Sequence, residues 1–324
     1  MRARLWLRIA ITAALCALLL IYVVDVREVG RTLTRCDPLW TLAALAALTL
    51  DRVLMSYKWG LLLAIRGYHV TLVQRLMVYC SAMMWGLALP STVGADGVRI
   101  LLVRRYGVRV NECLATVLVE RGVGFISALL TTLGGLVILR SALPNDPRHG
   151  AALALGALSL AAAISVLAFS FSNAALDSVL KLLPSRLRDS KAAQLLRRLH
   201  SAYRSLAFDK GRLAAFALLT FAEQILVIAC YGLAAVALGV EVRVLFLLAA
   251  VPLGILVSRL PISLDGIGVY ETIFMGVMAL GGVRPEDSLA ISLAVRALQI
   301  VVWLPWWLMM ALRCGSIRSP LRNL

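Results

Sequence analysis

The stretch PSTVGADGVR, from Pro90 to Arg99, interrupts an otherwise apolar segment of this 324-residue chain. About 170 residues later a second stretch, PISLDGIGVYE from Pro261 to Glu271, interrupts another. Both contain a proline, a hydroxyl residue, an acid followed by glycine, and then a valine and a charged residue. Paired interruptions at corresponding places in two halves of a membrane protein indicate a transporter-type binding site. The residues expected to form these breaks are Pro90, Ser91, Gly94, Asp96, Gly97, Pro261, Ser263, Asp265, Gly266 and Gly268.

The composition indicates that most of the chain lies in a lipid bilayer. Hydrophobic residues make up 61% of the sequence, only 15% of it is charged, and the mean hydropathy is +0.89. A soluble protein has about a quarter of its residues charged. We therefore expect one integral membrane domain over residues 1–324, an all-α polytopic helical bundle whose spans each need roughly 20 residues.

Apolar stretches predict the helices of this bundle. The first stretch follows three arginines and has no A-x-A cleavage pattern before Asp25, so we expect a retained signal anchor. The stretch at 270–282 is too short to span a bilayer. The stretches lie at about 5–24, 39–56, 73–89, 114–139, 151–171, 212–238, 244–260, 270–282 and 288–312.

The basic residues predict the orientation of the spans. A net charge of +16 would suggest nucleic acid in a soluble protein, but here Lys and Arg lie mostly in loops between apolar stretches. If the first broken segment enters and leaves through the cytoplasmic face, 23 basic residues lie on one side and seven on the other. This asymmetry predicts a bacterial inner-membrane protein with both termini in the cytoplasm and no nucleic-acid partner. The 23 lie within residues 1–8, 52–75, 99–109, 176–212 and 313–322.

The same count requires the second broken segment to enter and leave from the outside. Each half, about 1–150 and about 151–313, then holds two spans, a broken re-entrant helical hairpin and one more span. We expect the two halves to be inverted repeats, as in many transporters. Two tandem copies of an ordinary helical-bundle unit are the alternative.

A basic loop at 176–211 is expected to form an amphipathic helix on the anionic lipids of the inner leaflet. Apolar residues at helical spacing lie opposite arginines in its second part. A solvated loop that only follows the positive-inside pattern is the alternative. The apolar residues are Leu195, Leu196, Leu199, Tyr203 and Leu206.

Several charged residues remain inside the apolar segments. A charge at the bilayer centre costs at least about 2.5–3.5 kcal/mol, so these side chains are expected to face inward and pair. Glu120 and Arg121 are neighbours about 100° apart on a helix, so each needs a partner from another helix. The second half offers Glu223, Glu271 and Arg296 as candidates. The full set is Arg121, Arg259, Arg296, Glu120, Glu223 and Glu271, with Asp96, Arg99 and Asp265 in the breaks.

These charges predict a polar cavity for an anionic lipid headgroup. Arg99, Arg121 and Arg296 would hold its phosphate, and Glu120, Glu223 and Glu271 would balance the empty cavity. Helices that restart after Gly97 and Gly268 would add backbone N–H groups suited to a phosphate. An ion-pair network that only locks the bundle together is the alternative.

The sequence offers little for catalysis or metal binding. Its three histidines, His69, His149 and His200, fall in loops or near interfaces, and no H-E-x-x-H motif or P-loop occurs. Its six cysteines show no C-x-x-C spacing. We therefore expect no catalytic residues, no metal site and no cofactor, and a protein that is not an enzyme.

Four motifs, in combination, carry a family resemblance. They are LPSTVGAD at 89–96 followed by Arg99, ERGVG at 120–124, LPIS at 260–263 followed by Gly266, Gly268 and Glu271, and the lone Arg296. Together they resemble the lysylphosphatidylglycerol synthase transmembrane-region family, also called flippase-like, over essentially the whole chain. Ala95 and Asp265 stand where glycine is usual or common in that family.

The resemblance implies lipid translocation. In large members of the family this region flips an aminoacylated phospholipid made by a fused soluble synthase domain. Because the chain ends at Leu324, just after the last apolar stretch, we expect a stand-alone member that lacks this domain. The expected function is an inner-membrane translocase for an anionic phospholipid, glycolipid or isoprenoid lipid, with envelope-lipid biosynthetic enzymes as partners. The alternative is a non-transporting scaffold or subunit of an envelope-lipid modifying or glycosyltransferase pathway.

Overall fold

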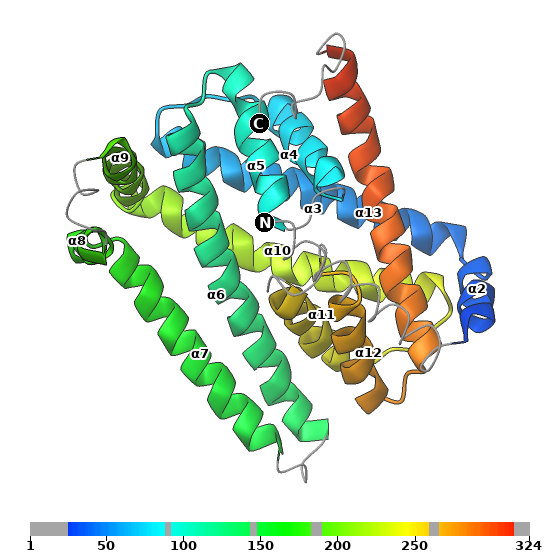
Figure 1. The fold of residues 1–324 in the computed structure, drawn as a ribbon. Helices are drawn as coiled ribbons and strands as arrows, with labels where there is room; N and C mark the ends of the chain where they lie inside the picture. The colour runs from blue at the N-terminus through cyan, green and yellow to red at the C-terminus, as the bar shows by residue number, and fades with distance from the viewer. Residues whose placement is uncertain (1–24, 88–91, 143–147, 183–189, 259–265, 314–324) are drawn as a thin grey trace.

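A computed structural model of the chain describes residues 25–87, 92–142, 148–182, 190–258 and 266–313 (Figure 1). Within these ranges it is an all-α bundle without strands, which confirms the expected fold class. The helices are α2 Val26–Thr34, α3 Pro38–Ile65, α4 Leu72–Gly86, α5 Thr92–Val103, α6 Val110–Ala142, α7 Arg148–Ser170, α8 Asn173–Leu182, α9 Lys191–Ser205, α10 Lys210–Ala237, α11 Val244–Ser258, α12 Val269–Leu280 and α13 Pro285–Arg313.

Several helix starts follow from local sequence. The side chain of Asp37 accepts hydrogen bonds from the first backbone N–H groups of α3, and Asp209 does the same for α10. Thr71 and Gln74 form a capping box at the start of α4. Five of the described helices, α3, α6, α7, α10 and α13, are long and apolar enough to cross a membrane, so the chain is a multi-pass membrane protein.

Helix lengths repeat between the two halves of the chain. Helices α3 and α10 each have 28 residues, α4 and α11 each have 15, and α5 and α12 each have 12. The long helices that follow, α6 and α13, have 33 and 29 residues. The structure therefore contains the same four-helix series twice.

Contacts between the halves are reciprocal as well. Helix α3 packs against its counterpart α10 through one of the most extensive interfaces in the bundle. The first hairpin packs through α4 against α13, and the second packs through α11 against α6 (Figure 1). The last long helix of each half therefore packs against the hairpin of the other half. The opposite sense of the two halves relative to the bilayer stays a prediction.

Both broken segments form helical hairpins. Helices of 15 and 12 residues are about 22 and 18 Å long, too short to cross a hydrocarbon core of about 30 Å. Close approach closes each hairpin: a Cβ added at Gly86 would lie 2.8 Å from the Cβ of Ala95, and one at Gly254 would lie 2.8 Å from the ring of Tyr270. The methyl group of Ala95 thus occupies space that Gly86 leaves.

The first break is shorter than we expected. Helix α5 already begins at Thr92, so Gly94, Asp96 and Gly97 lie inside a helix and the expected restart after Gly97 is wrong. In the second break, α12 does begin directly after Gly268, and Gly266 and Gly268 both have positive φ angles of 73° and 81°. Residues outside the described ranges include the expected first span at about 5–24 and Pro90, Ser91, Arg259, Pro261, Ser263 and Asp265.

Helix α3 extends further than the sequence analysis allowed. The apolar residues from Trp59 to Ile65 continue the helix past Arg52 and Lys58, which we had assigned to a cytoplasmic loop. Arg99 likewise lies within α5. Without these three residues, 20 of the 23 basic residues remain on the expected cytoplasmic side, against seven on the other. The predicted asymmetry therefore persists, but the assignment of Arg52, Lys58 and Arg99 to loops was wrong.

Helices α7, α8 and α9 flank α6 at the edge of the bundle (Figure 1). The described part of the basic loop is helical, and α9 packs its apolar side, including Leu199 and Tyr203, against the bundle. Leu195 is an exception because it is exposed. Binding of α9 to anionic lipids stays a prediction.

We predict that Gly135 and Gly134, neighbours on α6, respond oppositely to substitution. A Cβ at Gly135 would overlap the Leu248 carbonyl group of α11, whose carbon would lie at 2.6 Å, whereas one at Gly134 would meet no atom within 4 Å. Gly135→Ala should cost about 1–3 kcal/mol by overpacking, and Gly134→Ala should be neutral or stabilise by up to about 1 kcal/mol. Thermal denaturation of the purified protein in detergent measures both. Equal melting temperatures for the two variants would contradict the packing described.

Candidate functional site

Asp96 of α5 joins two arginines at the first break. Its Oδ2 accepts hydrogen bonds from Arg121 Nε at 2.8 Å and Nη2 at 2.5 Å, and its Oδ1 accepts one from Arg99 Nη2 at 3.3 Å. Because Arg121 belongs to α6, the pair fastens the short helix after the break to the long helix that follows. The carboxylate is buried, and the Arg121 side chain remains 37% exposed.

Arg99 is enclosed by carboxylates and aromatic rings. Its Nη1 donates to both carboxylate oxygens of Glu120, at 3.0 and 2.9 Å, and its guanidinium lies 5.1 Å from the ring centre of Trp59 and 4.9 Å from that of Tyr79. Tyr79 also donates a hydrogen bond to Glu120. With only 1% of Arg99 exposed, this guanidinium is an internal anchor.

The expected partners of Glu120 and Arg121 were therefore wrong. Glu120 pairs with Arg99 and Arg121 pairs with Asp96, so both find a counter-charge on α5 of their own half and not in Glu223, Glu271 or Arg296. The physical reason is the short break: α5 lies directly beside α6, so its acid and arginine reach α6 first.

A second ion pair follows the second break. Glu271 of α12 accepts a hydrogen bond from Arg296 of α13 at 3.4 Å, and its other oxygen accepts one from the backbone N–H of Gly268 at 2.7 Å. The backbone N–H group of Gly268, which was expected to bind a phosphate, is therefore already bound to Glu271.

These two ion pairs are equivalent in the repeat. Asp96 and Arg121 are 25 residues apart, and so are Glu271 and Arg296. Each arginine is the twelfth residue of its long helix. The structural counterpart of Asp96 is therefore Glu271, although the sequence likeness of the breaks had aligned Asp96 with Asp265.

A third ion pair joins the two halves and was missed by the sequence analysis. Lys58 Nζ of α3 donates to Glu223 of α10, and it also donates to Thr220 at 3.3 Å. Asp51 and Arg52, one to two turns earlier on α3, form a further buried pair. The available signal was the apolar sequence on both sides of Lys58, which marks it as a residue within a span.

The ion pairs Asp96–Arg121 and Lys58–Glu223 line one cavity of about 250 Å³. It lies between the halves, because α3, α4, α5 and α6 of the first half and α10 and α11 of the second contribute to it. The lining residues are Met55, Lys58, Tyr79, Met83, Ala95, Asp96, Glu120, Arg121, Gly124, Thr220, Glu223, Gln224, Ile255 and Ser258.

The cavity brings together part of the predicted site. Asp96, Glu120, Arg121 and Glu223 line it, and Arg99 lies behind Asp96 and Glu120. Glu271 and Arg296 do not belong to its lining. Chemically, the walls offer cations that an incoming anion can reach only by competing with a resident carboxylate.

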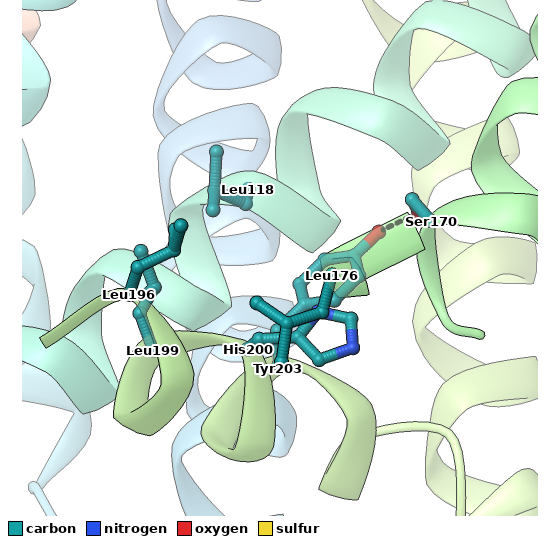
Figure 2. Close-up of a pocket in the computed structure, with 7 residues that line it drawn as sticks. All are labelled: Leu118, Ser170, Leu176, Leu196, Leu199, His200 and Tyr203. Carbon is teal, nitrogen blue, oxygen red and sulfur yellow. Dashed lines mark hydrogen bonds between the residues drawn. The ribbon is translucent and has the colours of Figure 1, made fainter. Parts of the chain in front are cut away.

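A larger cavity of about 310 Å³ lies between α6, α8 and α9 and is mostly apolar. Figure 2 shows four leucines around it and the hydrogen bond, 2.6 Å long, between the hydroxyls of Tyr203 and Ser170. Burial raises the pKa of the Tyr203 phenol, although the hydrogen bond acts in the opposite direction, so the hydroxyl stays protonated near neutral pH. The paired charges of the breaks are absent from its lining.

Comparison with known proteins identifies the family of this chain. The family model described as "Lysylphosphatidylglycerol synthase TM region" matches residues 5–306. No curated protein matches the chain.

We predict that Lys58 and Glu223 depend on each other for stability. Removing one partner of a buried ion pair costs about 3–5 kcal/mol, whereas replacing both by neutral groups costs far less. Lys58→Met and Glu223→Gln should each lower the free energy of unfolding by about that amount, and the double variant by much less than the sum. Denaturant unfolding in detergent measures the cycle. Additive losses would show that the two side chains act independently.

Proposed function

Because the chain belongs to the lysylphosphatidylglycerol synthase transmembrane-region family, we propose that it is a lipid translocase that moves a phosphate-bearing lipid across the membrane. The headgroup would enter the cavity between the two halves while its apolar chains stay in the bilayer. The expected substrates are anionic phospholipids, glycolipids or isoprenoid lipids. No catalytic step is part of this proposal.

One observation carries the proposal: Arg121 lies at the cavity, partly exposed, and is held there by Asp96. Charged side chains within membrane spans rarely face lipid, because exposing a charge to lipid is costly. They face the interior of the bundle and often mark the path of a substrate. Arg121 can form two parallel hydrogen bonds to a phosphate in place of those to the carboxylate. Arg99 then remains hydrogen-bonded to Asp96, although it is shared with Glu120.

The equivalent pair Glu271–Arg296 supports a two-step path. In a repeat protein, equivalent elements exchange environments when one half rocks against the other. Asp96–Arg121 lines the cavity in this structure, and Glu271–Arg296 would line one in the opposite state. The headgroup would pass from one arginine to the other as each carboxylate is displaced and restored.

Localisation and partners are part of the proposal. We place the protein in a bacterial inner membrane with both termini in the cytoplasm, on the strength of the basic loops. Helix α9 would then lie at the inner leaflet, where its arginines contact anionic lipids.

One observation favours the alternative, a non-transporting scaffold or subunit of an envelope-lipid pathway. In the apolar part of α7, residues 153–170, none of the residues is buried within the bundle. Such a face can bind lipid or the span of an envelope-lipid biosynthetic enzyme. A scaffold needs no cavity arginine, so variants of Arg121 separate the two functions.

We predict that Arg121→Gln slows lipid movement at least about tenfold. A hydrogen bond to a charged group contributes about 1.5–3 kcal/mol, and tenfold corresponds to about 1.4 kcal/mol. Proteoliposomes with fluorescent phospholipids measure the rate by dithionite quenching. The matched control is Arg284→Gln, which removes the same charge from an exposed ion pair with Asp287. Movement by Arg121→Gln at the wild-type rate would contradict the cavity path.

Arg296→Gln tests the two-step path. It should slow lipid movement by a factor similar to that of Arg121→Gln, although Arg296 does not line the described cavity, because the same headgroup must pass both arginines. The assay is the same, with rates normalised to reconstituted protein. If Arg296→Gln is folded, as judged by size-exclusion chromatography, and still moves lipid at the wild-type rate, the path involves only the pair Asp96–Arg121.

A further inference from the structure

The walls of the cavity between the halves are electrically balanced. Among the described residues, three cations and three carboxylates line it or lie directly behind its lining, and their formal charges sum to zero. The adjacent pair Asp51–Arg52 is neutral too. The cations are Lys58, Arg99 and Arg121, and the carboxylates are Asp96, Glu120 and Glu223.

An anion that enters alone upsets this balance. Displacing Asp96 from Arg121 leaves two carboxylates, Asp96 and Glu120, on the single guanidinium of Arg99. Both carboxylates and Arg99 are largely withdrawn from water, where an uncompensated charge is costly. A second cation is therefore needed at the same time as the phosphate.

The charges in the lining indicate where that cation would bind. Because Arg99 lies behind the wall, the surface of the cavity presents three carboxylates but only the two cations Lys58 and Arg121. An ammonium group donates three hydrogen bonds and has no acceptor, so it suits this surplus of carboxylates. Glu223 and Glu120 stand on different helices, α10 and α6, around the same space that Arg121 enters.

We infer that the headgroup accepted by this cavity is net neutral and carries a phosphate and an ammonium group together. The phosphate binds Arg121, and the ammonium binds among the carboxylates that line the same cavity, Asp96, Glu120 and Glu223. This inference rests on the proposed transport function, and it replaces the anionic substrates expected there by phosphate-bearing lipids whose headgroup also carries an ammonium group.

The test compares three phospholipids labelled on an acyl chain, so that the headgroups stay intact: phosphatidylethanolamine (net zero), phosphatidylglycerol (net −1) and lysylphosphatidylglycerol (net +1). Wild-type protein in proteoliposomes should move the neutral lipid at least about tenfold faster than either charged lipid. Arg284→Gln, which changes an exposed charge away from the cavity, should keep this order.

Charge variants of the cavity should shift the preference in a defined direction. Glu223→Gln leaves walls of net +1 and should favour phosphatidylglycerol, whereas Lys58→Met leaves net −1 and should favour the lysyl lipid. The double variant Lys58→Met/Glu223→Gln restores neutral walls and should again favour phosphatidylethanolamine, at whatever absolute rate. The wild-type comparison carries the test by itself if a single variant fails to fold.

The outcomes separate the two levels of the proposal. If all three lipids move at equal rates, or if the order ignores the charge of the walls, the inference is overturned while transport stands. Movement of phosphatidylglycerol at the rate of the neutral lipid, with uptake of a proton measured by a trapped pH dye, also overturns it. If none of the lipids moves faster than in protein-free vesicles, the proposed function itself fails.

Discussion

The ion pair between the helix after each break and the twelfth residue of the next long helix is the interaction on which the architecture depends. Helices α5 and α12 are too short to cross a bilayer, so length alone cannot fix them at depth. Their acids, Asp96 and Glu271, are anchored by arginines of α6 and α13. Each hairpin is thus tied to its own half by charge and packed against the other half by apolar contacts.

Equivalence between the halves does not extend to every charge. Shifted by the same 175 residues that relate Arg121 to Arg296, Arg99 corresponds to Phe274 and Glu120 to Val295. The second half therefore has two buried apolar residues where the first has a buried ion pair. Such an exchange of a buried pair for apolar side chains is often neutral in stability. It makes the interior of the first half more polar than that of the second, which fits the position of the described cavity.

Local sequence patterns predicted the elements well, because hydropathy and Pro/Gly breaks act within one segment. The membrane class and the two broken hairpins could all be predicted in this way. Pairing of charges could not, because it depends on which helices become neighbours. Sequence likeness of the two breaks aligned Asp96 with Asp265, whereas the spacing of the ion pairs makes Glu271 the structural counterpart of Asp96. Loop counting placed Lys58 outside the membrane, because the rule for basic residues does not distinguish a buried lysine from a flanking one.

The long reach of the ion pair between Lys58 and Glu223 has a consequence for how the protein is made. The most apolar part of helix α3 has the lowest hydropathy among those of the five candidate spans, and the helix carries three charged residues, Asp51, Arg52 and Lys58. Its partner Glu223 lies 165 residues later, so at about 5–20 residues per second it leaves the ribosome roughly 8–33 s after Lys58. During that interval Lys58 lacks the carboxylate that pairs with it in the folded bundle. The interface between α3 and α10 can therefore form only late in synthesis, after both spans have been made.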